Sequence, residues 1–415
     1  MDREQSINEL RLIFAQRRLV DAKNFCMNLT QEFPKDIEIW RMRANLHFQL
    51  NEIDQLAVCS QKILQLSNTV PLTNDLILAL DALGRILRKT DFLAETIDIR
   101  KRLLPFVPNE TATHFDIGCC YLALGDFEQG WPEFEWRLKL GLNQISKSKK
   151  PCWDGSPFKE KTLLITTEGG HGDTIQFIRY LPHIKDLGGT IILDVWNQPK
   201  IFSLLRNTNL ADVVIIDGKE KMEYDLEATM MSLPFLIKSL FNDIPSRVPY
   251  ISALSTSETE ARKNIARHTD AHCRVGVVWG TEKDPLRSIQ LDQFSELFNV
   301  AGIKFFSLQK GPLAIPLDIL TDLNPHIEDF ADTAAAIQEL DLVISVDTAV
   351  AHLAGALGKP VWTLIPFVPD WRWMLNREDS PWYPTMRLFR QPAPGDWASV
   401  IKRVSEELKA LVGAK

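Results

Sequence analysis

The feature that most constrains the fold of this chain is a helical repeat in its first third. Large apolar residues recur at Leu19, Ile53, Phe92 and Phe127, at spacings of 34, 39 and 35 residues. Glycines and β-branched runs are sparse across residues 1–140, and apolar residues return every three or four positions, the period of an amphipathic helix. A unit of this length is a pair of helices that buries its apolar face against the neighbouring pair. We therefore predict a stack of helical pairs.

The clearest unit lies at residues 118–134, where small and aromatic residues alternate. Gly118 and Gly130 occupy its small positions, and Ala44 and Ala22 occupy the corresponding positions of earlier units. Small residues allow the two helices of a unit to approach closely, while large side chains fill the gap to the next unit. The pattern is similar to the tetratricopeptide repeat (TPR). An irregular helical bundle with a chance similarity is the alternative.

The character of the chain changes near Pro151, after a polar connector at residues 147–155. Apolar, β-type runs then alternate with helical stretches, which predicts parallel α/β units. The expected strands are 161–167, 191–195 and 213–216 in one unit, and 274–279, 304–308, 342–346 and 360–365 in a second. A proline-containing linker at 241–270 separates the two units, and an amphipathic helix at 397–411 follows the last strand.

This pattern predicts a helical repeat domain over residues 1–145, two Rossmann-like domains over 155–255 and 270–395, and a C-terminal helix over 396–415. A chain of 415 residues has ample length for several such domains. Open parallel sheets bind ligands beyond the carboxyl ends of their strands. We therefore look for functional residues in the turns that follow the expected strands.

Composition excludes several classes of function. The formal net charge of −7 argues against a uniformly basic face for nucleic acid, so no nucleic-acid partner is expected. The six cysteines have no metal-site spacing, which favours free thiols in a reducing compartment. The first residues lack a signal-peptide pattern, and no apolar run is long enough to span a bilayer. We expect no membrane span and a cytoplasmic location.

The first motif, residues 168–174, follows the first expected strand and opens a helix. Gly170 and Gly172 permit close approach of the backbone to a ligand, and the helix start favours anionic groups. The motif lacks the Lys-Ser/Thr end of a Walker A loop. Asp173 is a candidate general base, and the alternative is that it caps the helix. Gln176, just beyond the motif, is grouped with Gly170 and Gly172 as a candidate binding residue.

The second motif, residues 345–360, runs from a strand end into a helix. Asp347 lies in the turn, and the amides of Thr348 and Ala349 stand at the helix start, which suits a diphosphate. His352 follows one turn later, on a face of small residues. A lone helical histidine is often structural, and that alternative stays open.

Two further turns carry polar residues. Arg287, after the strand that opens the second unit, is a candidate for binding a phosphate, with a solvated surface arginine as the alternative. After the next strand, Gln309 is a candidate ligand for a base or ribose and Lys310 for a phosphate, or both stand in a solvated turn. Aromatic residues at 369–373 and 382–384 either pack a long loop or shape a ligand pocket. No metal-site motif, DxD type included, is suitably placed.

Residues from about 114 to 410 resemble bacterial TPR-linked glycosyltransferases, which are related to the heptosyltransferase family and more distantly to the O-GlcNAc transferase family. The strings that carry the resemblance occur in the expected order: Trp153–Gly155, Gly172–Leu181, Arg287–Ile289, Ser307–Gly311, Asp329–Thr333, Asp347–His352 and Pro366–Trp373.

This resemblance implies an α-helical TPR repeat domain followed by an α/β GT-B fold, in which two Rossmann-like domains face a cleft. It also implies an inverting, metal-independent transfer from a nucleotide-diphospho-sugar, with no cofactor. The first Rossmann-like domain would be the acceptor side, and the second would bind the donor. The acceptor would be a protein, a peptide or a glycan, and the repeat arm would help to recognise it or another protein partner.

The resemblance also assigns roles. Asp173 matches the base position of heptosyltransferases, and the string from Asp347 through Thr348 and Ala349 to His352 matches their donor-binding string. Arg287 stands where those enzymes place a phosphate-contacting lysine, and Lys310 is similar in position to a phosphate-contacting lysine of the O-GlcNAc transferase group. The donor side also includes Asp332 and Thr333.

Two departures from the family pattern matter. His171 is an extra ionisable group beside Asp173, so either residue is a candidate for the base. Ala349 replaces a common glycine, which restricts close backbone approach. The rival interpretations are a non-enzymatic TPR scaffold with a degenerate glycosyltransferase body, and a nucleotide-sugar epimerase or a phosphorylase on the same fold.

Overall fold

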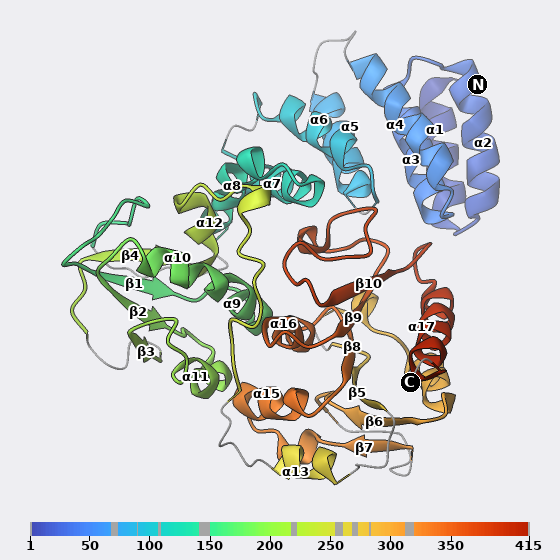
Figure 1. Cartoon of the computed structure of the whole chain (residues 1–415). Coiled ribbons are helices and arrows are strands. Elements are labelled where there is room, and N and C mark those ends of the chain that lie inside the picture. Colours follow the sequence, from blue (N-terminus) through green and yellow to red (C-terminus); the bar gives the residue numbers. More distant parts are fainter. Residues whose placement is uncertain are drawn as a thin grey trace. The chain divides into compact units, whose positions relative to one another are not determined.

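A computed structural model describes residues 2–67, 74–88, 90–106, 109–140, 150–216, 222–253, 260–267, 273–281, 284–311 and 319–413. The chain forms two compact units, whose helices and strands are labelled in Figure 1. The helical unit contains Met1–Leu140 and Asp370–Leu375, and the α/β unit contains Gly141–Pro369 and Asn376–Lys415. Among the described helices, none has the length and apolar character needed to cross a membrane.

The helical unit is a series of paired helices. Its described helices are α1 (Arg3–Ala15), α2 (Leu19–Glu32), α3 (Ile37–Gln49), α4 (Ile53–Ser67), α5 (Asn74–Leu87), α6 (Leu93–Leu103), α7 (Thr111–Leu124) and α8 (Phe127–Phe134), followed by the 3-10 helix η1 (Glu135–Lys139). The second helix of each pair begins at the repeating apolar position, except that α6 begins one residue after Phe92. The predicted helical pairs and their phase are therefore confirmed.

Local signals explain where these helices begin and how closely they pack. Asp126 caps α8 by accepting a hydrogen bond from the Gln129 amide at 3.1 Å. A Cβ at Gly118 would stand 2.6 Å from the backbone nitrogen of Phe134, and a Cβ at Gly130 would stand 2.7 Å from the Leu122 side chain. Because those separations are far below a normal carbon contact, α7 and α8 approach closely only with glycine at both positions.

A segment from far along the sequence completes the helical unit. Residues Asp370–Leu375 include the 3-10 helix η8 (Trp371–Trp373). The Trp371 ring lies edge-on to the rings of Trp131 and Phe134, with centroids 5.6 Å apart in both pairs. The packing interpretation of the aromatic string is therefore correct for Trp371, which is 6% exposed.

The first sheet of the α/β unit has four parallel strands in the order β3-β2-β1-β4. The strands are β1 (Thr162–Thr166), β2 (Thr190–Asp194), β3 (Val213–Ile215) and β4 (Leu226–Thr229). The helices between and after them are α9 (His171–Phe177), α10 (Leu181–Lys185), α11 (Pro199–Leu205) and α12 (Leu233–Leu236). Thr166 pairs with Asp194 and Thr229, so the carboxyl ends of three strands meet at one edge.

The second sheet has six parallel strands in the order β10-β9-β8-β5-β6-β7. The strands are β5 (Cys273–Val278), β6 (Ile303–Ser307), β7 (Leu320–Asp322), β8 (Leu342–Val346), β9 (Val361–Ile365) and β10 (Met386–Arg390). The accompanying helices are α13 (Glu260–Ala266), α14 (Leu291–Phe294), α15 (Phe330–Gln338), α16 (Ala349–Ala356) and α17 (Trp397–Gly413). The predicted class, helical repeats followed by a GT-B-like α/β body, is confirmed.

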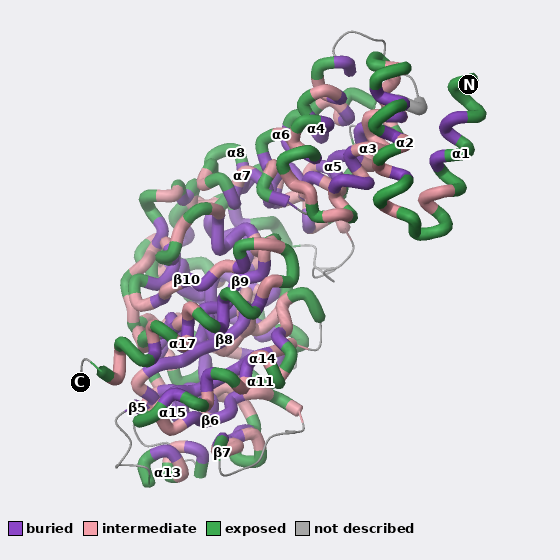
Figure 2. The backbone as a smooth tube through the Cα atoms, turned by 90° about the vertical axis from the view of Figure 1, so that its right-hand side faces the viewer, coloured by how far each residue is buried: buried purple, intermediate pink, exposed green. Residues whose placement is uncertain are grey.

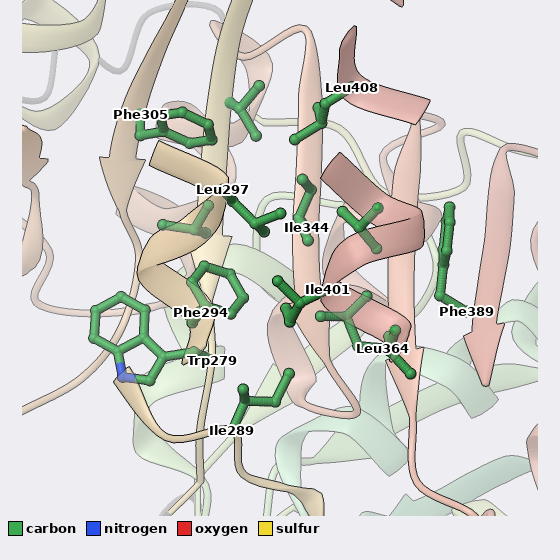
Figure 3. Close-up of a cluster of buried hydrophobic side chains, with 14 of the residues drawn as sticks. Trp279, Ile289, Phe294, Leu297, Phe305, Ile344, Leu364, Phe389, Ile401 and Leu408 are labelled. Atoms are coloured by element: carbon green, nitrogen blue, oxygen red, sulfur yellow. The ribbon is translucent and has the colours of Figure 1, made fainter. Parts of the chain in front are cut away.

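The C-terminal helix α17 completes the core of this second half. Figure 3 shows Ile401 and Leu408 of α17 in one buried cluster with Ile344 of β8 and Leu364 of β9. In Figure 2, β8 and β9 are coloured mainly as buried residues. Burial of each such side chain stabilises the fold by about 1.5–3 kcal/mol, so α17 is a structural part of this half.

The structure differs from the sequence-based predictions of strands and linker in two respects. Strands β4, β7 and β10 were not predicted. Part of the expected linker at 241–270 is packed: the Tyr250 amide donates to the Ala356 carbonyl at 3.1 Å, and Ile251 is buried. Residues 254–259 and 268–270 of that linker, and residues 147–149 of the expected connector, lie outside the described residues.

Candidate active site

The starts of helices α9 and α16 lie against each other, and this contact joins the two halves of the α/β unit (Figure 1). A Cβ at Gly172 of α9 would stand 3.0 Å from Cδ2 of His352 and 3.5 Å from Cα of Ala349. The glycine motif of the first half and the Asp347–His352 string of the second half therefore meet, although nearly 180 residues separate them in the sequence.

The turn before α9 is shaped by its own residues. Gly169 has a φ of 71°, a left-handed conformation that favours glycine, and Gly170 is the residue that precedes the first helical turn. Oδ2 of Asp173 accepts a hydrogen bond from the Gly170 amide at 2.7 Å. Asp173 is half-buried and is not the N-cap of the alternative, because Gly170 holds that position; its oxygen bonds back to the helix start from the third helical residue.

Neighbouring strand ends hold this turn in place. Gln198, after β2, accepts a hydrogen bond from the Thr174 hydroxyl at 2.8 Å and donates to the Gly169 carbonyl at 3.4 Å. Glu168 accepts a hydrogen bond from the Met231 amide, after β4, at 3.1 Å. Gln176, predicted as part of the acceptor-side loop, is fully buried. These contacts fix the backbone around Asp173.

His171 also contacts the second half of the unit. Its ring lies 4.8 Å from the ring of Phe330, the first residue of α15. Both candidate bases are thus carried by one turn, with His171 packed on an aromatic side chain and Asp173 bonded to the backbone.

The predicted donor-binding string, Asp347–His352, lies at the carboxyl end of β8. Asp347 is 5% exposed and Thr348 precedes the first turn of α16. The Thr348 hydroxyl shares a hydrogen bond with the Ser345 hydroxyl at 2.9 Å, and Ala349 is the first helical residue. A helix start presents backbone amides and the positive end of the helix dipole, which together favour an anion.

Arg287 is bound within this site. Its Nη1 donates to the backbone oxygen and to Oδ2 of Asp347, both at 3.3 Å, and its Nε donates to Asp284 at 3.1 Å. Arg287 is therefore an ion-paired residue and not the solvated surface arginine of the alternative. Residues 282 and 283 of the same loop lie outside the described residues.

Gln309 and Lys310 follow β6. The Gln309 carboxamide oxygen accepts hydrogen bonds from the amides of Trp279 and Gly280, at 3.2 and 3.0 Å, so this side chain braces the turn after β5. Nζ of Lys310 donates to the Ile327 carbonyl at 2.7 Å. Partial burial lowers the pKa of Lys310, and the charge of Lys200, on α11 of the first half, lowers it further.

Asp332 and Thr333 form the first turn of α15. Oδ2 of Asp332 accepts a hydrogen bond from the Glu328 amide at 3.0 Å, and the Thr333 hydroxyl donates to the Asp329 carbonyl at 2.9 Å. Asp329 caps the helix by accepting from the amides of Ala331 and Asp332. Both predicted residues therefore form hydrogen bonds at the helix start that also carries Phe330.

The sequence analysis assigned no role to a buried arginine of the α/β unit. Arg179, in the 3-10 helix η2 (Ile178–Tyr180), is 2% exposed. Its Nη2 donates to the Tyr250 hydroxyl at 2.9 Å, and its guanidinium lies 4.4 Å from the ring centroid of Tyr383. The available signal was a charged residue inside the apolar run 175–181.

Within the described residues, no three or more His, Cys, Asp or Glu side chains are grouped so that they would hold a metal ion. The six cysteines are free thiols; five are buried and Cys152 is exposed.

Residues 319–366 match the model of glycosyltransferase family 9 (heptosyltransferase). This segment runs from β7 through α15, β8 and α16 to β9, so it contains Asp332, Thr333 and the string from Asp347 to His352. The resemblance to heptosyltransferases is thereby confirmed over this segment.

Other similarities extend beyond this segment. Protein FlbA of Caulobacter vibrioides is 27% identical over 327 residues, which cover 69% of this chain and 53% of that protein. The chain thus spans about half the length of this curated relative. The structure of E. coli ADP-heptose LPS heptosyltransferase II is 15% identical in sequence. The match covers 60% of this chain and 98% of that one, with a TM-score of 0.46. The structure of a Thermobaculum terrenum O-GlcNAc transferase mutant is 12% identical in sequence. The match covers 100% of this chain and 94% of that one, with a TM-score of 0.32.

Proposed function

We propose that this protein is a glycosyltransferase that moves a sugar from a nucleotide-diphospho-sugar to an acceptor hydroxyl. The observation that carries the proposal is the contact of Gly172 with Ala349 and His352, because it joins the turn bearing Asp173 to the donor string. The family 9 match over that string supports the same reaction class.

In this proposal the diphosphate binds at the start of α16, where the amides near Thr348 and Ala349 and the helix dipole favour negative charge. Arg287 and Lys310 supply positive charge at the neighbouring strand ends. Fixed positive groups stabilise the charge that develops on the leaving nucleoside diphosphate, so the reaction needs no metal ion and no cofactor.

The acceptor is activated from the other half. Asp173 accepts the proton of the acceptor hydroxyl as that oxygen attacks the anomeric carbon and the bond to the diphosphate breaks, which inverts the configuration. The Gly170 amide holds one carboxylate oxygen and so orients the group. His171 is the alternative base on the same turn. We infer further that the helical repeats help to recognise a protein, peptide or glycan acceptor, since stacked repeats form extended binding surfaces.

Ligand-dependent thermal unfolding tests the donor side. We expect ADP, GDP, UDP or CDP to raise the melting temperature of the full chain. At a concentration of one hundred times Kd, a bound nucleotide adds about 2.7 kcal/mol to the free energy of unfolding. Arg287→Ala should reduce this effect, whereas Arg274→Ala should not, because Arg274 lies at the opposite end of β5 and pairs with Asp341. Absence of a response to every nucleotide and nucleotide sugar would favour a scaffold.

Sugar transfer tests the base. We expect Asp173→Asn to lower turnover by about 10²–10⁴-fold, the usual contribution of a general base. The asparagine oxygen still accepts from Gly170, so the helix start is preserved. Asp126→Asn is the matched control, since Asp126 caps α8 in the helical unit. The mechanism is wrong if Asp173→Asn and Arg287→Ala both retain full transfer activity.

A further inference from the structure

The peptide group between Gly169 and Gly170 stands next to the candidate base. Its N–H donates to Oδ2 of Asp173 at 2.7 Å, and its carbonyl oxygen accepts from Nε2 of Gln198 at 3.4 Å. The N–H and C=O of a trans peptide group point in opposite directions, so the carboxylate and the carboxamide lie on opposite sides of this group. One peptide group therefore connects a glutamine at a strand end to the candidate base.

Glycine on both sides leaves the orientation of this peptide group undetermined. Gly169 has a φ of 71° and Gly170 a φ of −101°, and glycine adopts positive and negative φ with similar ease. A Cβ at Gly169 would collide with Oδ2 of Asp173, so a larger residue there would displace the carboxylate. Backbone preferences therefore do not prevent the peptide group from turning its N–H away from Asp173. Hydrogen bonds from outside the turn must select the observed orientation.

Gln198 supplies such a bond. It is 4% exposed, follows β2 and stands directly before the first residue of α11. Its carboxamide oxygen accepts from the hydroxyl of Thr174, a fully buried residue, at 2.8 Å. Because Thr174 holds the oxygen, the NH₂ group faces the Gly169 carbonyl. The reverse orientation would place the carboxamide oxygen against that carbonyl, and neither atom has a hydrogen to donate.

These hydrogen bonds form a chain with one direction. Thr174 donates to Gln198, Gln198 donates to the Gly169 carbonyl, and the amide of the same peptide group donates to Asp173. Hydrogen bonds in such a chain polarise one another, and the last one is strengthened by the charge of its acceptor. Asp173 and Thr174 are neighbours in α9, so the chain begins and ends on one helix and encloses its start.

We propose that Gln198 is a positioning residue, which through the Gly169–Gly170 peptide group sets the direction in which the carboxylate of Asp173 is held. This structural statement concerns the protein alone. Its consequence for turnover rests on the proposed function, in which Asp173 accepts the proton of the acceptor hydroxyl. A displacement of about 1 Å in an active site costs about 10²-fold in rate, so loss of this chain slows transfer although Gln198 touches no substrate.

The structural statement is tested without any ligand, in the full chain labelled with ¹⁵N-glycine. Gly170→Ala identifies the Gly170 amide signal. We expect Gln198→Met and Thr174→Val to move this signal upfield and to speed its exchange with solvent, because the amide loses its carboxylate partner. Thr174→Ser keeps the hydroxyl and should match the wild type, as should Thr96→Val, at a fully buried threonine of the helical unit. Thr174→Val preserves the side-chain shape, so the test stands even where Gln198→Met does not fold. An unchanged Gly170 amide in either folded variant would overturn the proposal.

Kinetics tests the consequence for turnover. With a nucleotide sugar that the wild type turns over, Gln198→Met and Thr174→Val should lower kcat by about tenfold or more, while the Kd of a nucleoside diphosphate changes little. Because Gln198 acts through Asp173, Gln198→Met should have no further effect on kcat in the Asp173→Asn background. Unchanged kcat, additive losses in that cycle, or an equal loss of nucleotide affinity would overturn the role of Gln198. A wild type that binds no nucleotide and transfers no sugar would refute the proposed function and leave the result for the Gly170 amide standing.

Discussion

Substitution of Gly172 by alanine tests the contact between the two halves of the α/β unit. The new methyl group would stand 3.0 Å from Cδ2 of His352 and 3.5 Å from Cα of Ala349. Carbon atoms pack best at about 3.5–4.0 Å, so the helix starts must separate by about 0.5 Å or the His352 ring must turn. The ring cannot turn without breaking its hydrogen bond to Tyr383.

The magnitude follows from two opposing effects. Overpacking of a filled interior costs about 1–3 kcal/mol. Alanine is better than glycine within a helix by about 0.5–1 kcal/mol, which offsets part of that cost. We expect a net destabilisation of about 1 kcal/mol, which lowers Tm by about 2–4 °C in a domain of this size. Transfer should fall more, by about tenfold, because a small displacement in an active site is costly.

Gly170→Ala is the matched control for this substitution. Gly170 has a φ of −101°, and its added Cβ would meet only Asp173 Oδ2, at an ordinary 3.6 Å. Thermal unfolding and sugar transfer are measured for both variants. The reasoning fails if Gly172→Ala matches the wild type, or if Gly170→Ala is impaired as strongly as Gly172→Ala.

Three further results are expected. Gly155→Ala should destabilise the α/β unit by at least about 2 kcal/mol in chemical unfolding, because φ is 88° and the added Cβ would stand 2.1 Å from the Leu236 carbonyl oxygen; stability equal to the wild type would contradict this. Trp371→Ala should lower the stability of the helical unit by about 3–5 kcal/mol in thermal unfolding, since it removes a buried aromatic side chain from Trp131 and Phe134. Nucleoside diphosphate affinity, measured by calorimetry, should fall as the pH rises through the lowered pKa of Lys310, because only its protonated form attracts the anion; Lys200→Met should move this loss to higher pH by removing the neighbouring charge.

The success of the fold prediction depended on the strength of local patterns. The helical repeat was predictable because each second helix begins at a large apolar residue, as Phe127 does after the turn at Gly125. The central strands are buried apolar runs, and β8 has the predicted bounds of Leu342–Val346. The missed strands β4, β7 and β10 are all at sheet edges. Edge strands are short or carry charged residues, as Met386–Arg390 does, so the apolar run is absent.

The candidate site was predictable as a set of turns but not as a set of contacts. Parallel strands bring their carboxyl-terminal turns to one edge, which located the turns of Asp173, Asp347 and Lys310. Partners far apart in the sequence were not predictable. The carboxamide oxygen of Gln309 accepts from the Trp279 and Gly280 amides, because only the fold brings the ends of β5 and β6 together. Binding of a base or ribose by Gln309 stays a prediction.

The aromatic string near the C-terminus illustrates the same limit. Sequence proximity grouped Trp371 with Tyr383, but the fold separates their roles. Trp371 packs on Trp131 in the helical unit, whereas Tyr383 contacts His352 and lies under Arg179 in the α/β unit. Nothing in the local pattern distinguishes these two environments, since both require large, buried aromatic side chains.

The ion pair between Arg287 and Asp347 constrains how a donor is bound. In the structure the protein itself neutralises Arg287, so a diphosphate that recruits this arginine exchanges one partner for another. Replacing one ion pair by another yields far less free energy than forming an additional ion pair. The reason is that the carboxylate of Asp347, which is 5% exposed, loses a positive partner in the exchange. The arginine also donates to the Asp347 backbone oxygen, and that bond survives the exchange and keeps the guanidinium in place. A donor that recruits Arg287 therefore gains affinity if it also offers Asp347 a hydrogen-bond donor, as the hydroxyl groups of a nucleotide sugar do.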